Sequence, residues 1–131
     1  MSPFNQTTVR PCLLVAHRDA LYVAMMSRAF RRLGWDVYPA HNSGEARRLA
    51  RMLTPDLVLL GADFPDETGW LVCDKMRRDL PEVRVFVIAE TNDEVNGDFG
   101  RFVGARGVVT RTHSAESILQ ELHGKPFSLA S

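Results

Sequence analysis

Short apolar runs alternate with longer amphipathic segments along most of this chain. The runs are rich in valine, leucine and isoleucine, which is typical of strands buried on both faces of a sheet. They lie at 12–16, 56–61, 83–89 and 107–110. A further strand is predicted at 35–40, and Pro39 indicates an edge position because proline cannot donate a hydrogen bond to a neighbouring strand.

The segments between these strands carry apolar residues three or four positions apart, the spacing of one face of an α-helix. Asp19 is predicted to cap the first helix by accepting hydrogen bonds from free backbone N–H groups, and Gly34 to end it. Ser43 begins the next predicted helix and Pro55 stops it. This alternation predicts an α/β fold, a three-layer, doubly wound parallel sheet with helices on both faces.

The fourth predicted helix contains two glycines that weaken it. Val95, Phe99 and Phe102 keep helical spacing, so the pattern favours a core role for both rings. Gly97 and Gly100 interrupt the same segment, and each weakens a helix by about 1 kcal/mol relative to alanine. We therefore expect this helix to be the least regular of the set.

The composition and the net charge limit the classes of partner that the chain can attract. Of the 131 residues 45% are hydrophobic, and 16 basic residues balance 16 acidic ones, so no global field attracts nucleic acid or a membrane. The cluster Arg47, Arg48 and Arg51 is interpreted as a solvated helix face. No apolar stretch approaches the roughly 20 residues that cross a bilayer, and no secretion signal precedes the first strand. We expect a cytoplasmic location.

The length suits one domain, which is predicted at 11–123. A flexible N-terminal arm is predicted at 1–10 and a C-terminal tail at 124–131, which either stays free or folds back onto the sheet. Cys12 and Cys73 lie on apolar sides of their segments and are interpreted as buried thiols. Because no Cys or His pair has the spacing of metal ligands, we expect neither a metal nor any other cofactor.

Three stretches carry a resemblance to a known family. Pro65 and Gly69 follow the end of the third strand by four and eight positions, and the turn into the last strand holds Gly104 and Ala105. The stretches are DLVLLGADFPDETG, LVCDKMR and GARGVVTRT. In order and spacing they resemble the receiver domain of two-component response regulators. The resemblance implies a five-stranded, flavodoxin-like sheet of strand order 2-1-3-4-5, with the functional site at the carboxyl ends of the strands.

The chain departs from this family at the positions that carry its chemistry. The resemblance implies an acidic pair, a phosphoacceptor aspartate, a hydroxyl residue and a lysine, around a magnesium ion. In this chain Ala16 and His17 stand at the positions of the acidic pair, and Gly61 stands at the position of the acceptor aspartate. Ala89 replaces the hydroxyl residue and Arg111 replaces the lysine. Mg²⁺ needs clustered oxygen ligands, and acyl phosphate formation needs a carboxylate. We therefore predict a degenerate pseudo-receiver that is no enzyme and holds no magnesium. Val108, at the place of the aromatic switch residue, also removes the conformational readout.

Cationic side chains gather at the rim of this degenerate pocket. His17, Arg18 and Arg111 are expected there, with Asp19 and Asp63 as the nearest carboxylates. An ion pair between Arg111 and Asp63 is favoured, since buried arginine normally finds a carboxylate. A bound anion is the alternative.

The leading hypothesis is a phosphorylation-independent regulatory module that acts through protein–protein interaction in bacterial signal transduction. The partner is a signalling protein or a second copy, and direct contact with nucleic acid is not expected. An exposed apolar pair at the start of the third helix would mark a binding patch, to which the fourth helix could add its rings. The candidate partner-binding residues are Trp70, Leu71, Phe99 and Phe102.

Three alternatives stay open. The first is a small-ligand or anion sensor that uses His17, Arg18 and Arg111 in the cationic former pocket. The second is phosphorylation at Asp63, two residues beyond the usual acceptor position. The third is a phosphotyrosine phosphatase loop, because Cys12 and Arg18 have its cysteine-to-arginine spacing.

Overall fold

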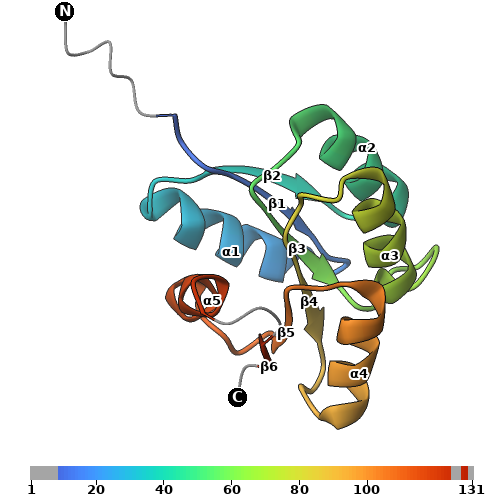
Figure 1. Ribbon diagram of the computed structural model, residues 1–131. Helices are drawn as coiled ribbons and strands as arrows, with labels where there is room; N and C mark the ends of the chain where they lie inside the picture. The colour runs from blue at the N-terminus through green and yellow to red at the C-terminus, as the bar shows by residue number, and fades with distance from the viewer. Residues whose placement is uncertain (1–8, 125–127, 130–131) are drawn as a thin grey trace, which may run out of the picture.

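Every strand predicted from the apolar runs is present in the computed structural model, which describes residues 9–124 and 128–129 (Figure 1). The strands are β1 (Cys12–Ala16), β2 (Asp36–Ala40), β3 (Leu57–Gly61), β4 (Val85–Ala89), β5 (Gly107–Thr110) and β6 (Ser128–Leu129). The helices are α1 (Ala20–Arg32), α2 (Ser43–Leu53), α3 (Gly69–Asp79), α4 (Glu94–Val103) and α5 (Ala115–Leu122).

All strand pairings are parallel, and the strand order is β2-β1-β3-β4-β5-β6. The predicted order 2-1-3-4-5 is confirmed, and β2 with its Pro39 lies at an edge. The sheet continues past the five predicted strands, because Gly107 and Val108 pair with Ser128 and Leu129. These two tail residues therefore return to the sheet. The predicted arm, apart from residues 9 and 10, lies outside the described residues.

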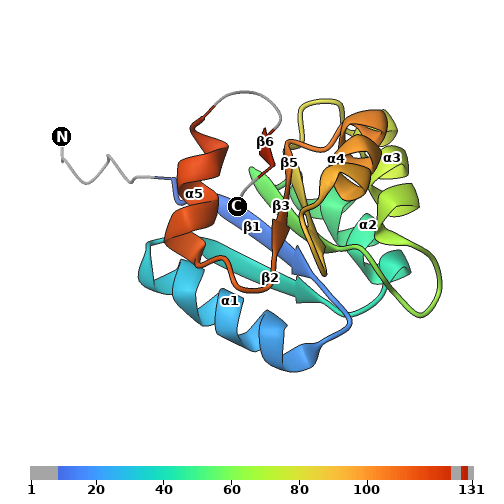
Figure 2. The same cartoon turned by 90° about the horizontal axis from the view of Figure 1, so that it is seen from below.

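The two faces of the sheet are covered by different helices (Figure 2). α1 and α5 lie on one face, and α2, α3 and α4 lie on the other. Successive residues of β1 serve the two cores in turn: Leu13 and Val15 pack with α1 and α5, whereas Leu14 and Ala16 pack with the other layer. The carboxyl ends of β1, β3, β4 and β5 lead into the segments that connect them to the following helices, at the edge where sheets of this type place their ligands.

Helix ends follow the local chemistry of the chain. Asp19 caps α1 as predicted, because its Oδ1 accepts hydrogen bonds from the backbone N–H groups of Leu21 (3.0 Å) and Tyr22 (3.3 Å). Gly34 follows the helix with a φ of 93°, which favours glycine. Between residues 9 and 124, none of the helices combines the length and the apolar character needed to cross a membrane.

The regularity of α4 and the direction of its side chains both differ from the sequence-based expectation. The helix is continuous from an N-cap at Asp93 to Gly104, so it is not irregular. Gly97, Gly100 and Val103 are its buried residues. The apolar side chains face solvent instead, with Val95 62%, Phe99 48% and Phe102 87% exposed. A core role for the two rings is therefore wrong, because the glycines occupy the inner face, where the helix lies beside α3 and β5.

Candidate functional site

A cavity of about 290 Å³ opens at the carboxyl ends of the central strands. We call it the strand-end cavity. Its lining residues are His17, Arg18, Asp19, Ala62, Asp63, Ile88, Glu90 and Arg111. It brings together the side chains that the sequence placed at the rim, from the loops after β1, β3 and β5. Ala16 and Ala89 end their strands in buried positions, and Gly61 ends β3 just before Ala62.

The imidazole of His17 occupies the space above Gly61. A Cβ atom built on Gly61 would lie 2.8 Å from Cδ2 of that ring, closer than real Cβ atoms approach, and 3.2 Å from its Cγ, which is tighter than most real contacts. Gly61 has no left-handed backbone, since among the described glycines positive φ occurs at Gly34 and Gly104. A side chain at this position would therefore require the ring to move, whereas the backbone conformation is no obstacle to it.

Three contacts hold His17 in place, and two of them involve its ring. Its backbone N–H donates to the carbonyl of Ala40 (3.1 Å), and its Nδ1 accepts the backbone N–H of Asp19 (2.9 Å). The ring of Tyr22 lies 4.9 Å away between centroids. With 9% of its surface exposed, His17 is a packed residue and not a solvated loop histidine.

The environment of His17 favours its neutral form. Burial lowers the pKa of His17, and the guanidinium of Arg111 lowers it further, against the opposing effect of Asp19. Because Nδ1 accepts the N–H of Asp19, it carries no proton. Protonation of Nδ1 would break that hydrogen bond and place a positive charge near Arg111.

Both arginines at the rim have carboxylate partners, but not the expected ones. Nη1 of Arg18 donates to Oδ2 of Asp63 (3.1 Å), and Nη1 of Arg111 donates to Oδ2 of Asp19. The predicted pair between Arg111 and Asp63 is therefore wrong. Asp19 can take this role because its Oδ1 caps α1 and leaves Oδ2 for the guanidinium. The pKa of Asp19 is lowered most by the hydrogen bond from the backbone N–H of Tyr22. The backbone N–H of Leu21 and the guanidinium of Arg111 lower it further.

The strand-end cavity lacks the excess of positive charge expected from the sequence. Two guanidinium groups face three carboxylates, those of Asp19, Asp63 and Glu90, and His17 is neutral. Each guanidinium is already paired. An entering anion would have to compete with these carboxylates.

The second candidate site is the exposed apolar row on α4, formed by Val95, Phe99 and Phe102, which we call the α4 stripe. The ring of Phe99 lies 5.5 Å from that of Trp70 on α3, with 36° between their planes. Trp70 is half-buried and packs against the core on this face of the sheet. Leu71 is also exposed, but it lies about 100° further around α3 than Trp70.

Periodicity alone could not assign the α4 stripe to solvent. It identifies an apolar row but not the direction that the row faces. The available signal was the pair Gly97 and Gly100, three residues apart on a different face of the same helix. A helix face without side chains can lie close against its neighbours, so the glycines mark the inner side.

The phosphatase hypothesis is contradicted by the position of its two key residues. Cys12 begins β1, and Arg18 follows the opposite end of the same strand. Burial, with contributions from Asp56 and Asp36, raises the pKa of the Cys12 thiol. A nucleophilic cysteine needs a lowered pKa and a loop that surrounds phosphate.

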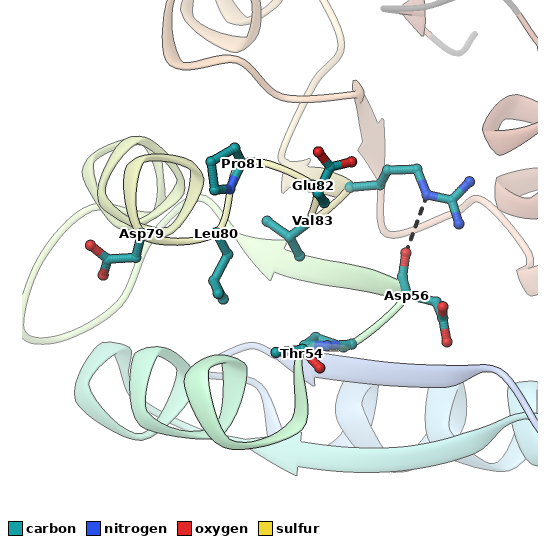
Figure 3. A pocket seen from close by; sticks show the side chains of 9 residues that line it. Thr54, Asp56, Asp79, Leu80, Pro81, Glu82 and Val83 are labelled. Atoms are coloured by element: carbon teal, nitrogen blue, oxygen red, sulfur yellow. Dashed lines mark hydrogen bonds between the residues drawn. The ribbon is translucent and has the colours of Figure 1, made fainter.

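A second cavity, of about 410 Å³, lies at the amino ends of β3 and β4, opposite to the strand ends that line the first cavity (Figure 3). Leu80, Pro81 and Val83 supply apolar surface, and Nε of Arg84 donates to the carbonyl of Asp56 (3.3 Å). Its lining contains no histidine or cysteine. The cavity has no counterpart in the sequence-based hypotheses.

The strand order, the two helical layers and the strand-end cavity define a flavodoxin-like α/β domain. Residues 13–123 match the family model of the response regulator receiver domain, and the chain belongs to that family. It is a receiver domain of bacterial two-component response regulators.

Two relatives are similar to this chain in sequence, and a solved structure shares its fold. The chain is 28% identical over 110 residues to the probable transcriptional regulatory protein TcrX of Mycobacterium tuberculosis, covering 84% of this chain and 47% of TcrX. It is 26% identical over 114 residues to the DNA-binding dual master transcriptional regulator RpaA of Synechocystis, covering 83% and 46%. The chain thus spans about half the length of these relatives. The chemotaxis protein CheY4 of Vibrio cholerae has the same fold, with a TM-score of 0.80, 19% identity, and coverage of 87% and 97%.

The family implies a magnesium ion at the strand ends, but the residues present do not fit one. Ala16 and Gly61 offer no side-chain oxygen, and His17 offers a neutral nitrogen. Within residues 9–124 and 128–129, no group of three or more His, Cys, Asp or Glu side chains is placed to hold a metal ion. The carboxylates of Asp19 and Asp63 are engaged in ion pairs with arginine.

Proposed function

We propose that this chain is a degenerate receiver that regulates without phosphorylation, by binding another protein in bacterial signal transduction. One observation carries the proposal: the His17 ring fills the space into which a side chain at Gly61 would project. This supports the proposal because glycine has no carboxylate at this position and a side chain there would require the His17 ring to move.

The chemistry of the remaining residues supports this proposal. Acyl phosphate formation needs a carboxylate nucleophile and a divalent cation held by further carboxylates. Asp63 is the nearest alternative acceptor, yet its Oδ2 accepts a hydrogen bond from Arg18 (3.1 Å). A nucleophile in this arrangement would first have to leave its ion pair. We propose that the chain has no enzymatic activity of its own.

The two residues that would carry the family's conformational signal are also replaced in this chain. A hydroxyl at the end of β4 and a ring in β5 would couple the phosphoryl group to the surface. This chain has Ala89 and Val108 there, both buried. A ligand shifts an equilibrium only through different affinities for the two states. We therefore propose a binding surface that is permanently available.

The best-supported binding surface is the α4 stripe together with Trp70. Large apolar side chains gathered on one exposed face mark protein–protein contacts. Leu71 remains a candidate, but it lies further around α3.

The name of RpaA describes a DNA-binding protein, which is at odds with the expectation of no nucleic acid contact. We propose that DNA contact does not involve this chain, because its charges balance.

Acetyl phosphate tests the proposed function directly. The chain is incubated with acetyl phosphate and magnesium, and its intact mass is measured; we expect no phosphoryl adduct. A receiver with an acceptor aspartate serves as the positive control. A mass gain that disappears in Asp63→Ala would show phosphorylation at the displaced acid and overturn the proposal.

The sensor alternative has no observation in its favour, because the strand-end cavity holds paired arginines and more carboxylates than guanidinium groups. A thermal-shift series with phosphate and nucleotides tests it. We expect no stabilisation by either, and a rise in Tm that disappears in Arg111→Gln would support the sensor instead.

A further inference from the structure

We infer that His17 is a pH-dependent switch whose ring has two positions. In the neutral form the ring lies above Gly61 and holds the amino end of α1, and in the protonated form it turns into the strand-end cavity. This inference goes beyond the proposed function, because it concerns the response of the chain to acid and not its contact with a partner. Its basis is the contrast between the two environments that border the ring.

The position above Gly61 suits only a neutral ring. Nδ1 of His17 accepts the backbone N–H of Asp19 (2.9 Å), so a proton on Nδ1 would set two donors against each other. The ring is buried and lies against Tyr22, which is itself neutral because burial raises the pKa of its hydroxyl. Burial, and then the guanidinium of Arg111, lower the pKa of His17 in this position.

The strand-end cavity, which His17 also lines, offers the opposite environment. The charged groups around it come from four segments: Arg18 and Asp19 before α1, Asp63 after β3, Glu90 after β4, and Arg111 after β5. Three carboxylates thus face two guanidinium groups, and a protonated His17 would make the charges equal. The cavity of about 290 Å³ has room for the ring, since one water molecule takes about 30 Å³ of liquid.

Glu90 is the carboxylate that can receive the protonated ring. Asp63 is paired with Arg18, and Asp19 is paired with Arg111. Within residues 9–124 and 128–129, the side chain of Glu90 forms no ion pair and no hydrogen bond. An opposite charge favours the charged form of its neighbour. The cavity therefore stabilises the cation that the position above Gly61 excludes.

Movement of the ring would act on the rest of the domain through Asp19. The backbone N–H of Asp19 donates to His17, its Oδ1 caps α1, and its Oδ2 accepts the guanidinium of Arg111. When the ring leaves, the N–H of Asp19 loses its acceptor. Acid therefore loosens both the cap of α1 and the link between α1 and the segment that joins β5 to α5.

NMR spectroscopy of the 131-residue chain, titrated from about pH 7.5 to about pH 5, tests this inference. A nuclear Overhauser effect between the Cδ2 proton of His17 and the α-protons of Gly61 reports the ring position, because Cδ2 would lie 2.8 Å from a Cβ atom there. We expect this signal to disappear as the imidazole is protonated. With the same midpoint, the protection of the Asp19 amide against hydrogen exchange should fall about fivefold or more, as expected for one lost hydrogen bond.

Glu90→Gln tests the role of the cavity. It removes the carboxylate that receives the cation, so the same change should require a roughly two- to fivefold higher proton concentration. Glu82→Gln is the matched control, because it removes an equal charge beside the second cavity, at the other ends of the strands, and should leave the midpoint unchanged. Both residues are exposed, so neither variant should affect folding, and the amide spectra verify this.

Failure of this inference and failure of the proposed function give different results. A ring that keeps its contact with Gly61 after it is protonated, or until the chain unfolds, overturns the switch. A midpoint that Glu90→Gln shifts no more than Glu82→Gln does overturns it as well. A phosphoryl adduct in the intact-mass experiment overturns the proposed function and leaves the switch unaffected.

Discussion

The contact between His17 and Gly61 predicts an energetic coupling between the two positions. Gly61→Ala adds one methyl group, which would lie 2.8 Å from Cδ2 of the His17 ring. Without this obstacle, alanine in place of a strand glycine would stabilise the fold by about 0.5–1 kcal/mol. Extra atoms in a packed site instead cost about 1–3 kcal/mol. We expect Gly61→Ala to destabilise the chain by roughly 1–2 kcal/mol.

The same substitution should change sign once the ring is removed. His17→Ala by itself loses the contact with Tyr22 and the acceptor for the N–H of Asp19, so it is destabilising. In that background the methyl group on Gly61 meets no ring and should stabilise by a few tenths of a kcal/mol or more. The coupling energy of the double-mutant cycle is then about 1–3 kcal/mol.

Urea unfolding followed by far-UV circular dichroism measures the four free energies of this cycle. Equal slopes across the variants verify that the unfolding reactions are comparable. Effects that add to within about 0.5 kcal/mol would show that the ring does not fill the acceptor space. That result would also remove the observation that carries the proposed function.

Three further predictions address the same region and the core. The pKa of His17 lies below its usual value of 6.5, so the stability that neutral His17 contributes is complete above that pH and is lost on acidification. Between about pH 7.5 and about pH 5, the urea midpoint of the wild type should therefore fall more than that of His17→Gln. A Cβ atom on Gly69 would lie 1.8 Å from the carbonyl oxygen of Gly61, so Gly69→Ala should cost about 3 kcal/mol, and His17→Ala should not relieve it. Burial raises the pKa of Cys73 to about 12, so a thiol reagent should label it in urea but not in the folded chain.

Much of the fold follows from local signals in the sequence. The central strands form continuous apolar runs because both of their faces are covered, and Pro39 identified the edge strand because it lacks a donor. Asp19 was recognisable as a cap because its carboxylate precedes an amphipathic segment. The two-residue strand β6 was missed, because so short a segment carries no periodic pattern.

The parts that could not be predicted depend on the path of the chain in space. Which carboxylate meets Arg111 is decided by the positions of two loops, and Asp19 lies closer than Asp63. The position of the His17 ring above Gly61 depends on a contact between residues 44 positions apart. The outward direction of Phe102 depends on what lies beneath α4. Pattern and composition do not give the first two contacts, and for the third the only signal in the helix was its pair of glycines, Gly97 and Gly100.

The two candidate sites differ in the free energy that they can offer a partner. At the strand ends, the rim charges already form ion pairs with exposed members, each worth about 0–1 kcal/mol, and a ligand would gain little by exchanging them. The α4 stripe has no such internal compensation. An aromatic side chain buries roughly 150–250 Å², so the exposed fractions of Val95, Phe99 and Phe102 amount to on the order of 350 Å². At about 25 cal/mol per Å² their burial provides roughly 9 kcal/mol, and association costs about 4–15 kcal/mol. The larger favourable free energy that a bound protein could gain therefore lies at the α4 stripe, where Phe102 is 87% exposed.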